Sequence, residues 1–245
     1  MSDFTFERND NTVEGFASNQ AKTAFMKTSV TNDLIPQLPN GFYRLHLTQK
    51  DELIYISCKV PDLPSKVYGD LTEDRERIIH TFKSRKSSTG VLLSGLKGSG
   101  KTLQAKLIIH ELSLTMPVII VDEFIHPSVI KLAVAQLGMC CIFVDEFEKL
   151  YPMSGKDQDD KQIGFLSLLD GMGVGKALYL LTVNQVYVND NLMNRPGRIF
   201  YHKEYNCLSF NFISSYLKDT LKNKDIVADL TARLFFSEAS FDIVQ

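Results

Sequence analysis

The feature that most constrains this chain is a glycine-rich segment, GLKGSGKT, at residues 95–102. An apolar run, VLLS, precedes it, and a pattern of helical spacing follows it. Glycines between a buried strand and a helix allow a tight turn in which backbone N–H groups and the helix N-terminus converge on an anion. A match to G-x-x-x-x-G-K-[ST] occurs by chance in about one chain per hundred of this length. The segment predicts a phosphate-binding loop if the rest of the chain builds the surrounding sheet.

The order of elements around this loop predicts an α/β fold. Short apolar runs alternate with helical patterns, and the runs are continuously apolar rather than alternating. Such runs are typical of a parallel sheet with helices on both faces. We expect five strands, at 91–95, 117–123, 139–146, 178–184 and 198–205, and helices at 72–86, 101–115, 127–137 and 162–169.

The two ends of the chain differ from this central part. Residues 1–40 are polar without sustained periodicity, which predicts an N-terminal arm, and 41–70 hold two alternating apolar stretches that predict a β-hairpin. A nucleotide-binding α/β domain is expected at 71–206. In 207–245, two amphipathic patterns predict a small helical lid, and we expect that lid to be cut short within its last element.

Composition narrows the class of protein. The 245 residues are 44% hydrophobic, enough to build a core, and 27 basic residues face 29 acidic ones. This balance provides no global positive field for nucleic acid. No apolar run approaches the roughly 20 residues that a membrane span needs. We therefore expect a soluble, intracellular protein of the cytoplasm without a membrane span.

Two side chains of the phosphate loop have functional groups suited to a nucleotide and its metal ion. The Lys101 ammonium can reach the β- and γ-phosphates of a nucleotide, and the Thr102 hydroxyl can ligate Mg²⁺. The loop residues expected to contact the nucleotide are Gly95, Leu96, Lys97, Gly98, Ser99, Gly100, Lys101, Thr102 and Leu103.

A second group on the magnesium side is expected from CIFVDE, where an apolar strand ends in two acids. Asp145 would hold the metal, and Glu146 could orient or deprotonate the attacking water. Taken alone, the pattern equally describes a strand that ends in surface acids. Asp122 and Glu123, at the end of PVIIVDE, are the alternative pair.

Two further features belong to the same edge of the sheet. Asn184 ends the fourth strand and could hydrogen-bond the water or a γ-phosphate oxygen. Arg195 and Arg198 flank a Pro-Gly pair just before the fifth strand. Exposed cations on a turn are the ordinary interpretation of such a pair. Beside a nucleotide site they become candidates for an arginine that acts on a neighbouring subunit's γ-phosphate.

Together, GLKGSGKT, CIFVDE, LLTVN and NLMNRPGRI resemble the AAA family of ATPases in order and spacing, over about residues 88–205. The resemblance implies the P-loop NTPase fold and makes Lys101 and Thr102 the Walker A pair. It likewise matches Asp145 and Glu146 to Walker B, Asn184 to sensor 1, and Arg195 and Arg198 to the arginines of the second region of homology.

The resemblance also suggests where the base would lie and where the chain departs from the family. The segment KVYGDL occupies the base-contacting position, which makes Val67, Tyr68 and Gly69 candidates, and an ordinary turn fits equally. The family's substrate-threading loop is an aromatic–hydrophobic–glycine motif, whereas this chain has EFIHPSVIKL without a glycine. Threading of a peptide is therefore in question.

The resulting hypothesis is an ATPase that uses ATP, ADP and Mg²⁺. The family resemblance implies a homo-oligomeric ring, hexameric by analogy, that remodels a protein substrate. One alternative is a nucleic-acid-directed motor or loader, which the near-neutral charge disfavours. Another is a scaffold that binds ATP to assemble with little turnover, and Glu146 argues against it because a scaffold needs no catalytic carboxylate.

Overall fold

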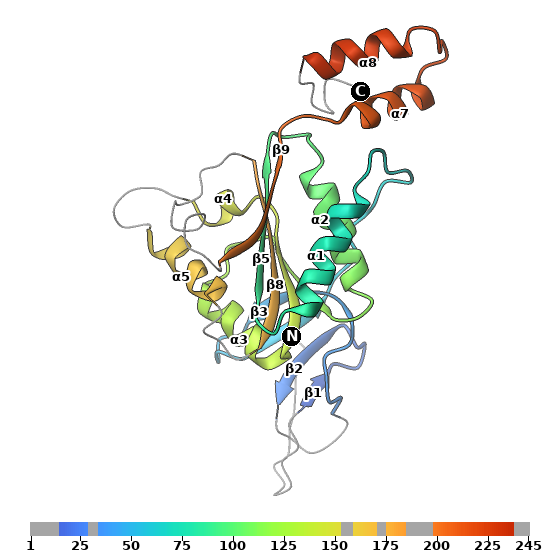
Figure 1. The fold of residues 1–245 in the computed structure, drawn as a ribbon. Helices are drawn as coiled ribbons and strands as arrows, with labels where there is room; N and C mark the ends of the chain where they lie inside the picture. Colours follow the sequence, from blue (N-terminus) through green and yellow to red (C-terminus); the bar gives the residue numbers. More distant parts are fainter. Residues whose placement is uncertain (1–14, 29–33, 153–158, 171–174, 185–197, 238–245) are drawn as a thin grey trace, which may run out of the picture.

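Nine strands form one sheet in the computed structural model, which describes residues 15–28, 34–152, 159–170, 175–184 and 198–237 (Figure 1). The order across the sheet is β1-β2-β4-β3-β6-β7-β8-β5-β9. The strands are β1 Gly15–Ser18, β2 Ala24–Thr28, β3 Gly41–Leu47, β4 Leu53–Ser57, β5 Thr89–Gly95, β6 Pro117–Val121, β7 Met139–Val144, β8 Lys176–Val183 and β9 Ile199–Tyr205.

The five predicted strands form a continuous parallel half, β6-β7-β8-β5-β9. β5 lies between β8 and β9, so the phosphate loop leaves the sheet from an interior strand. The central strands are buried along nearly their whole length, as continuous apolar runs predict. The expectation of an α/β fold with a parallel sheet is confirmed.

Helices cover both faces, as the sequence predicts (Figure 1). α1 (Thr72–Ser84) and α2 (Lys101–Leu112) lie on one face, and α3 (Pro127–Leu137), α4 (Phe147–Leu150) and α5 (Asp159–Leu169) lie on the other. Each face has its own apolar core. The side chains of the parallel strands alternate between these two cores, which is why the strands must be apolar at every position.

The interpretation of residues 1–40 as an arm is wrong for its described part from 15 to 28. Here β1 and β2 pair antiparallel with each other, and β2 pairs with β4. The predicted β3–β4 hairpin joins the main sheet because β3 runs parallel to β6. Strands of four and five residues are too short to show periodicity, and they are fixed by distant contacts such as that of Phe16 with Tyr55. Residues 1–14 lie outside the described residues.

Two helices, α7 (Phe210–Thr220) and α8 (Val227–Phe236), follow β9 where the sequence predicts a lid, and we refer to this pair of helices as the lid. α7 begins at a Ser209 cap, whose hydroxyl accepts a hydrogen bond from Phe212 N. A small core of their own, including Leu208, Ile213 and Val227, holds them together beyond the end of β9 (Figure 1). Residues 238–245, where we expect the lid to be cut short, lie outside the described residues. No helix in the described part of the chain is long and apolar enough to span a membrane.

A candidate nucleotide-binding site at the end of the sheet

The predicted phosphate loop connects the end of β5 to the start of α2. Three of its residues, Gly95, Gly98 and Gly100, have φ of +136°, +75° and +98°, a region that side chains rarely adopt. At Gly95 a Cβ would lie 2.0 Å from the carbonyl oxygen of Tyr205, so the approach of β9 also requires glycine. The backbone conformation of the loop therefore requires glycine at these positions. The turn that they form ends at the N-terminus of α2, where backbone N–H groups are available.

Lys101 lies inside the loop and is only 4% exposed. Its Nζ donates hydrogen bonds to the carbonyl oxygens of Gly95 and Leu96, at 2.9 and 2.5 Å. Burial lowers the pKa of Lys101, and nearby acids, with Glu148 the largest contributor, oppose that shift. The loop thus holds a cation close to the place where the sequence predicts phosphate.

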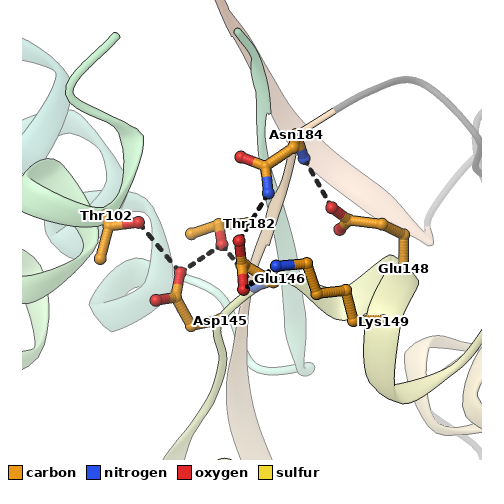
Figure 2. A network of polar contacts seen from close by, with 7 residues as sticks. All are labelled: Thr102, Asp145, Glu146, Glu148, Lys149, Thr182 and Asn184. Atoms are coloured by element: carbon orange, nitrogen blue, oxygen red, sulfur yellow. Dashed lines mark hydrogen bonds and ion pairs between the residues drawn. The ribbon is translucent and has the colours of Figure 1, made fainter. Parts of the chain in front are cut away.

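Two hydrogen bonds that share one carboxylate oxygen join the phosphate loop to the neighbouring strands (Figure 2). The hydroxyls of Thr102 and Thr182 both donate to Asp145 Oδ1, at 3.1 and 2.5 Å. Hydroxyl and carboxylate oxygens are the hard ligands that Mg²⁺ prefers. Thr102 and Asp145, which the sequence predicts as metal ligands, are therefore brought together, and their chemistry fits the ion.

Glu146 follows at a sharp bend and has φ of +51°, an uncommon conformation for a residue with a side chain. Its backbone N–H donates to the Thr182 hydroxyl, and its carboxylate accepts from Asn184 Nδ2 at 2.7 Å and Lys149 Nζ at 2.6 Å (Figure 2). Lys149 makes the largest contribution to lowering the pKa of Glu146. Asn184 and Lys97 lower this pKa further, whereas partial burial of the carboxylate raises it. The carboxylate is therefore held in its ionised form.

Thr182 belongs to the candidate site although the sequence analysis does not predict it. It is 1% exposed, and its one hydroxyl contacts both Asp145 and the backbone of Glu146. The available signal is a threonine within the apolar strand LYLLTVN, two residues before Asn184 and so on the same face of the strand.

The alternative acidic pair lies elsewhere. Asp122 pairs with Arg44 of β3, whose Nε donates to its carboxylate at 2.7 Å. After Asp122, the loop that follows β6 packs against Tyr151. The Tyr151 hydroxyl donates to the carbonyl of Ile125 at 2.6 Å, and the centroid of its ring lies 5.4 Å from that of Phe124. The structure therefore brings Asp145, not Asp122, to Thr102.

A cavity of about 770 Å³ opens beside these groups. Its lining includes the loop from Lys97 to Leu103, together with Asn184, Tyr68 and Gly69. Gly95, Leu96 and Val67, which the sequence also predicts as contacts, are not among its lining residues, and the carbonyls of the first two hold Lys101 instead. Asp145 and Glu146 reach the cavity through Thr102 and Asn184, which line it.

Another part of the cavity lining, the aromatic end, includes Tyr68 and is shared with the lid. The ring of Tyr68 packs edge-on against Phe212 and Tyr216 of α7, with centroids 6.0 and 5.3 Å apart. Lys66 forms an ion pair with Asp219 at the end of the same helix. These contacts bind the segment before α1 to the lid.

The structure describes only one of the two candidate arginines. Arg195 lies outside the described residues. Arg198 is 6% exposed, and its Nε and Nη2 donate to the two oxygens of Asp170, at 2.7 and 2.9 Å. This hydrogen-bonded pair raises the pKa of Arg198, so the guanidinium is satisfied within its own chain.

Comparison with known proteins decides the family. Residues 91–205 match the model described as "ATPase family associated with various cellular activities (AAA)". Residues 91–205 form a domain of the AAA family of ATPases. The matched span of this AAA protein contains the whole phosphate loop, Asp145, Glu146 and Asn184.

Curated relatives of this AAA protein agree. It is 32% identical to human ATPase family gene 2 protein homolog A over 126 residues, which are 44% of this chain and 14% of that protein. It is 32% identical to peroxisomal ATPase PEX6 of Dictyostelium discoideum over 127 residues, 45% of this chain and 11% of that protein. A 26S proteasome regulatory subunit 4 homolog of Encephalitozoon cuniculi (strain GB-M1) is 27% identical over 173 residues, which are 58% of this chain and 41% of that protein. The aligned part of the AAA protein thus covers less than half the length of each of these relatives.

Proposed function

We propose that this AAA protein couples Mg²⁺-dependent ATP hydrolysis to the remodelling of a protein substrate or assembly, as a ring of identical subunits. One observation carries the proposal: Thr102 of the phosphate loop meets the acidic pair Asp145 and Glu146, which follows β7, at the carboxyl edge of the sheet next to a cavity. Ligands of open α/β sheets bind at this edge.

Binding would begin with the phosphate loop. Lys101 would exchange the carbonyls of Gly95 and Leu96 for oxygens of the β- and γ-phosphates. Thr102 and Asp145 would hold Mg²⁺, which when bound neutralises charge on the phosphates. The base would lie toward the aromatic end, where Tyr68 and Gly69 line the cavity.

Hydrolysis then requires a base for the attacking water. The water oxygen forms a bond to the γ-phosphorus as the bond to the β–γ bridging oxygen breaks, and the water proton passes to the carboxylate of Glu146. Asn184 and Lys149 fix the orientation of that carboxylate and keep it ionised. Thr182 positions Asp145 and the backbone of Glu146.

A protein substrate is favoured over nucleic acid for two reasons. The chain has a formal net charge of −2, and the relatives include a peroxisomal ATPase and a proteasome regulatory subunit homolog. The contacts of Asp122 with Arg44 and of Ile125 with Tyr151 attach the loop after β6 to the body. They support remodelling in which this loop does not thread a peptide. Location in the cytoplasm stays a prediction.

The ring follows from the proposed role of an arginine supplied by a neighbouring subunit. Because Asp170 holds Arg198 within its own chain, the proposal assigns the trans-acting role to Arg195 and a supporting role to Arg198. In such an arrangement each site is incomplete in a single subunit, so turnover depends on assembly.

The test is ATP turnover per subunit across a protein concentration series in Mg²⁺. It compares the wild type, Glu146→Gln, Arg195→Ala and an equal mixture of the two variants. We expect the rate to rise with concentration, both variants to be inactive and the mixture to recover part of the activity. A concentration-independent rate insensitive to Arg195→Ala would reject the ring. Negligible turnover despite ATP-dependent assembly would favour the scaffold, and salt-sensitive DNA binding the nucleic-acid motor.

A further inference from the structure

The phosphate loop carries a second lysine at the tip of a tight turn. Ser99 N–H donates to the carbonyl of Leu96 at 3.3 Å, and Gly98, the third residue of this turn, has φ of +75°. Together these features describe a type II turn with Lys97 at its second position. The Ser99 hydroxyl strengthens the turn through a 2.6 Å hydrogen bond to the same carbonyl. The backbone that bears Lys97 is therefore fixed.

Lys97 and Lys101 occupy opposite environments on this one loop. Lys101 is buried and bound to two carbonyls, whereas Lys97 is exposed and lines the cavity. Among the described residues, no hydrogen-bond or ion-pair partner holds the Lys97 ammonium. A long, unpaired cation beside a cavity can move to a ligand without first breaking a contact.

The geometry of the loop indicates which end of the cavity Lys97 faces. Lys97 directly follows Leu96, whose carbonyl oxygen accepts a hydrogen bond from the Lys101 ammonium at 2.5 Å, and it lines the same cavity as Thr102 and Asn184. The aromatic end, by contrast, is formed by Tyr68 and the lid. Lys97 thus belongs to the end where the terminal phosphate would undergo hydrolysis.

We propose that Lys97 is a γ-phosphate-binding residue that acts in cis, so that the loop itself distinguishes ATP from ADP and neutralises the charge of the phosphate that leaves. The inference rests on the proposed function, because it places ATP in this cavity. It assigns part of the stabilisation expected from a neighbour's arginine to a lysine of the same subunit. Lys101, in this arrangement, serves both nucleotides, and Lys97 serves ATP alone.

The experiment measures the dissociation constants of ADP and of the β,γ-imido analogue of ATP, in Mg²⁺, by calorimetry. The proteins are the wild type, Lys97→Met, Lys97→Arg and Lys131→Met, a charge-matched control on the exposed surface of α3. Loss of one charge-assisted hydrogen bond corresponds to roughly 10- to 100-fold in affinity. We expect Lys97→Met to weaken the analogue by this factor and ADP by less than threefold. Lys97→Arg should largely restore the preference, and Lys131→Met should change nothing.

Three results would overturn the inference while leaving the proposed function intact. One is an unchanged preference for the analogue over ADP in Lys97→Met, which would make Lys97 a solvated turn residue. Another is an equal loss of both nucleotides, which would place its contact on the α- or β-phosphate. The third is failure of Lys97→Arg to restore the preference. If the wild type binds neither nucleotide, the proposed function itself fails, so the two failures are distinct.

Discussion

Asn184 Nδ2 lies 2.7 Å from Glu146 Oε1, so the end of β8 fixes the carboxylate that follows β7. These two strands are neighbours in the sheet, and a hydrogen bond across them makes the position of the proposed base depend on strand pairing. Lys149 holds the other oxygen from the first turn of α4. The base is therefore positioned before any nucleotide binds.

Replacing Glu146 by glutamine should slow ATP hydrolysis by roughly 10²- to 10⁴-fold, because the amide cannot accept the water proton. Nucleotide affinity should stay within threefold of the wild-type value, because Glu146 lies outside the phosphate loop. Steady-state phosphate release and ADP calorimetry measure the two effects. Glu123→Gln is the matched control from the alternative acidic pair, and a comparable loss there would place the base after β6.

Thr182→Val should reduce turnover by roughly 10- to 100-fold and raise the Mg²⁺ concentration needed for half-maximal activity. Valine keeps the volume but removes a buried hydroxyl that serves both Asp145 and Glu146 N, a loss of about 1–3 kcal/mol. Magnesium titrations of activity provide the measurement. Thr182→Ser keeps the hydroxyl and should retain most activity; equal damage from serine would mean that packing, not hydrogen bonding, is responsible.

Lys149→Met should move the acidic limb of the activity profile to higher pH. Glu146 must be ionised to accept a proton, so activity falls as the pH drops through its pKa. Lys149 makes the largest contribution to lowering that pKa, and its removal raises the pKa and brings the loss of activity closer to neutrality. A pH series of kcat checks this. Lys149→Arg should keep the wild-type limb, and an unmoved limb in the methionine variant would show that Lys149 does not control the pKa of Glu146.

Arg198→Ala should destabilise the fold by about 3–5 kcal/mol, because it leaves the Asp170 carboxylate without its buried partner. Thermal or urea unfolding, at a concentration where subunits do not associate, provides the measurement. Arg233→Ala breaks an exposed pair with Asp229 on α8 and should cost less than about 1 kcal/mol. If Arg198→Ala is as mild as this control and yet abolishes turnover, the trans-acting role belongs to Arg198 after all.

Asp219→Asn should accelerate nucleotide release. The change removes the ion pair with Lys66, one of the contacts between the lid and the segment before α1. The pair is exposed, so we expect only a two- to fivefold faster dissociation of ADP, and added salt should diminish the difference. Stopped-flow displacement of a fluorescent ADP measures it. Asp229→Asn, elsewhere on the lid, should have no effect, and identical rates in all three proteins would separate the lid from nucleotide exchange.

Local signals predicted the elements that surround the loop. α3 begins at Pro127 and ends before Gly138, as the two residues predict, because proline suits a first turn and this glycine adopts φ of +73°. Continuous apolar runs predicted the parallel strands, because each strand contributes to a core on both faces. The spacing of the motifs along the chain likewise predicted that Asp145, rather than Asp122, meets Thr102.

Contacts between distant residues could not be predicted in this way. β1 and β2 exist because Phe16 and Phe25 pack on tyrosines of the hairpin, a fact that their own short segments do not show. The pairing of Arg198 with Asp170 joins residues 28 positions apart and depends on where α5 ends. Thr182 acquires its role only because β7 and β8 are adjacent.

The hydrogen bonds between β3 and β6 have a mechanical consequence. They make the N-terminal strands part of the same sheet as the phosphate loop, rather than a module that hangs on a flexible tether. With strands about 4.8 Å apart, β1 and β9 are separated by roughly 40 Å. A slight rotation of the sheet near the phosphate loop would move β1 over a larger distance than the strands beside the loop. A protein bound at β1 would therefore be displaced further than the nucleotide site itself.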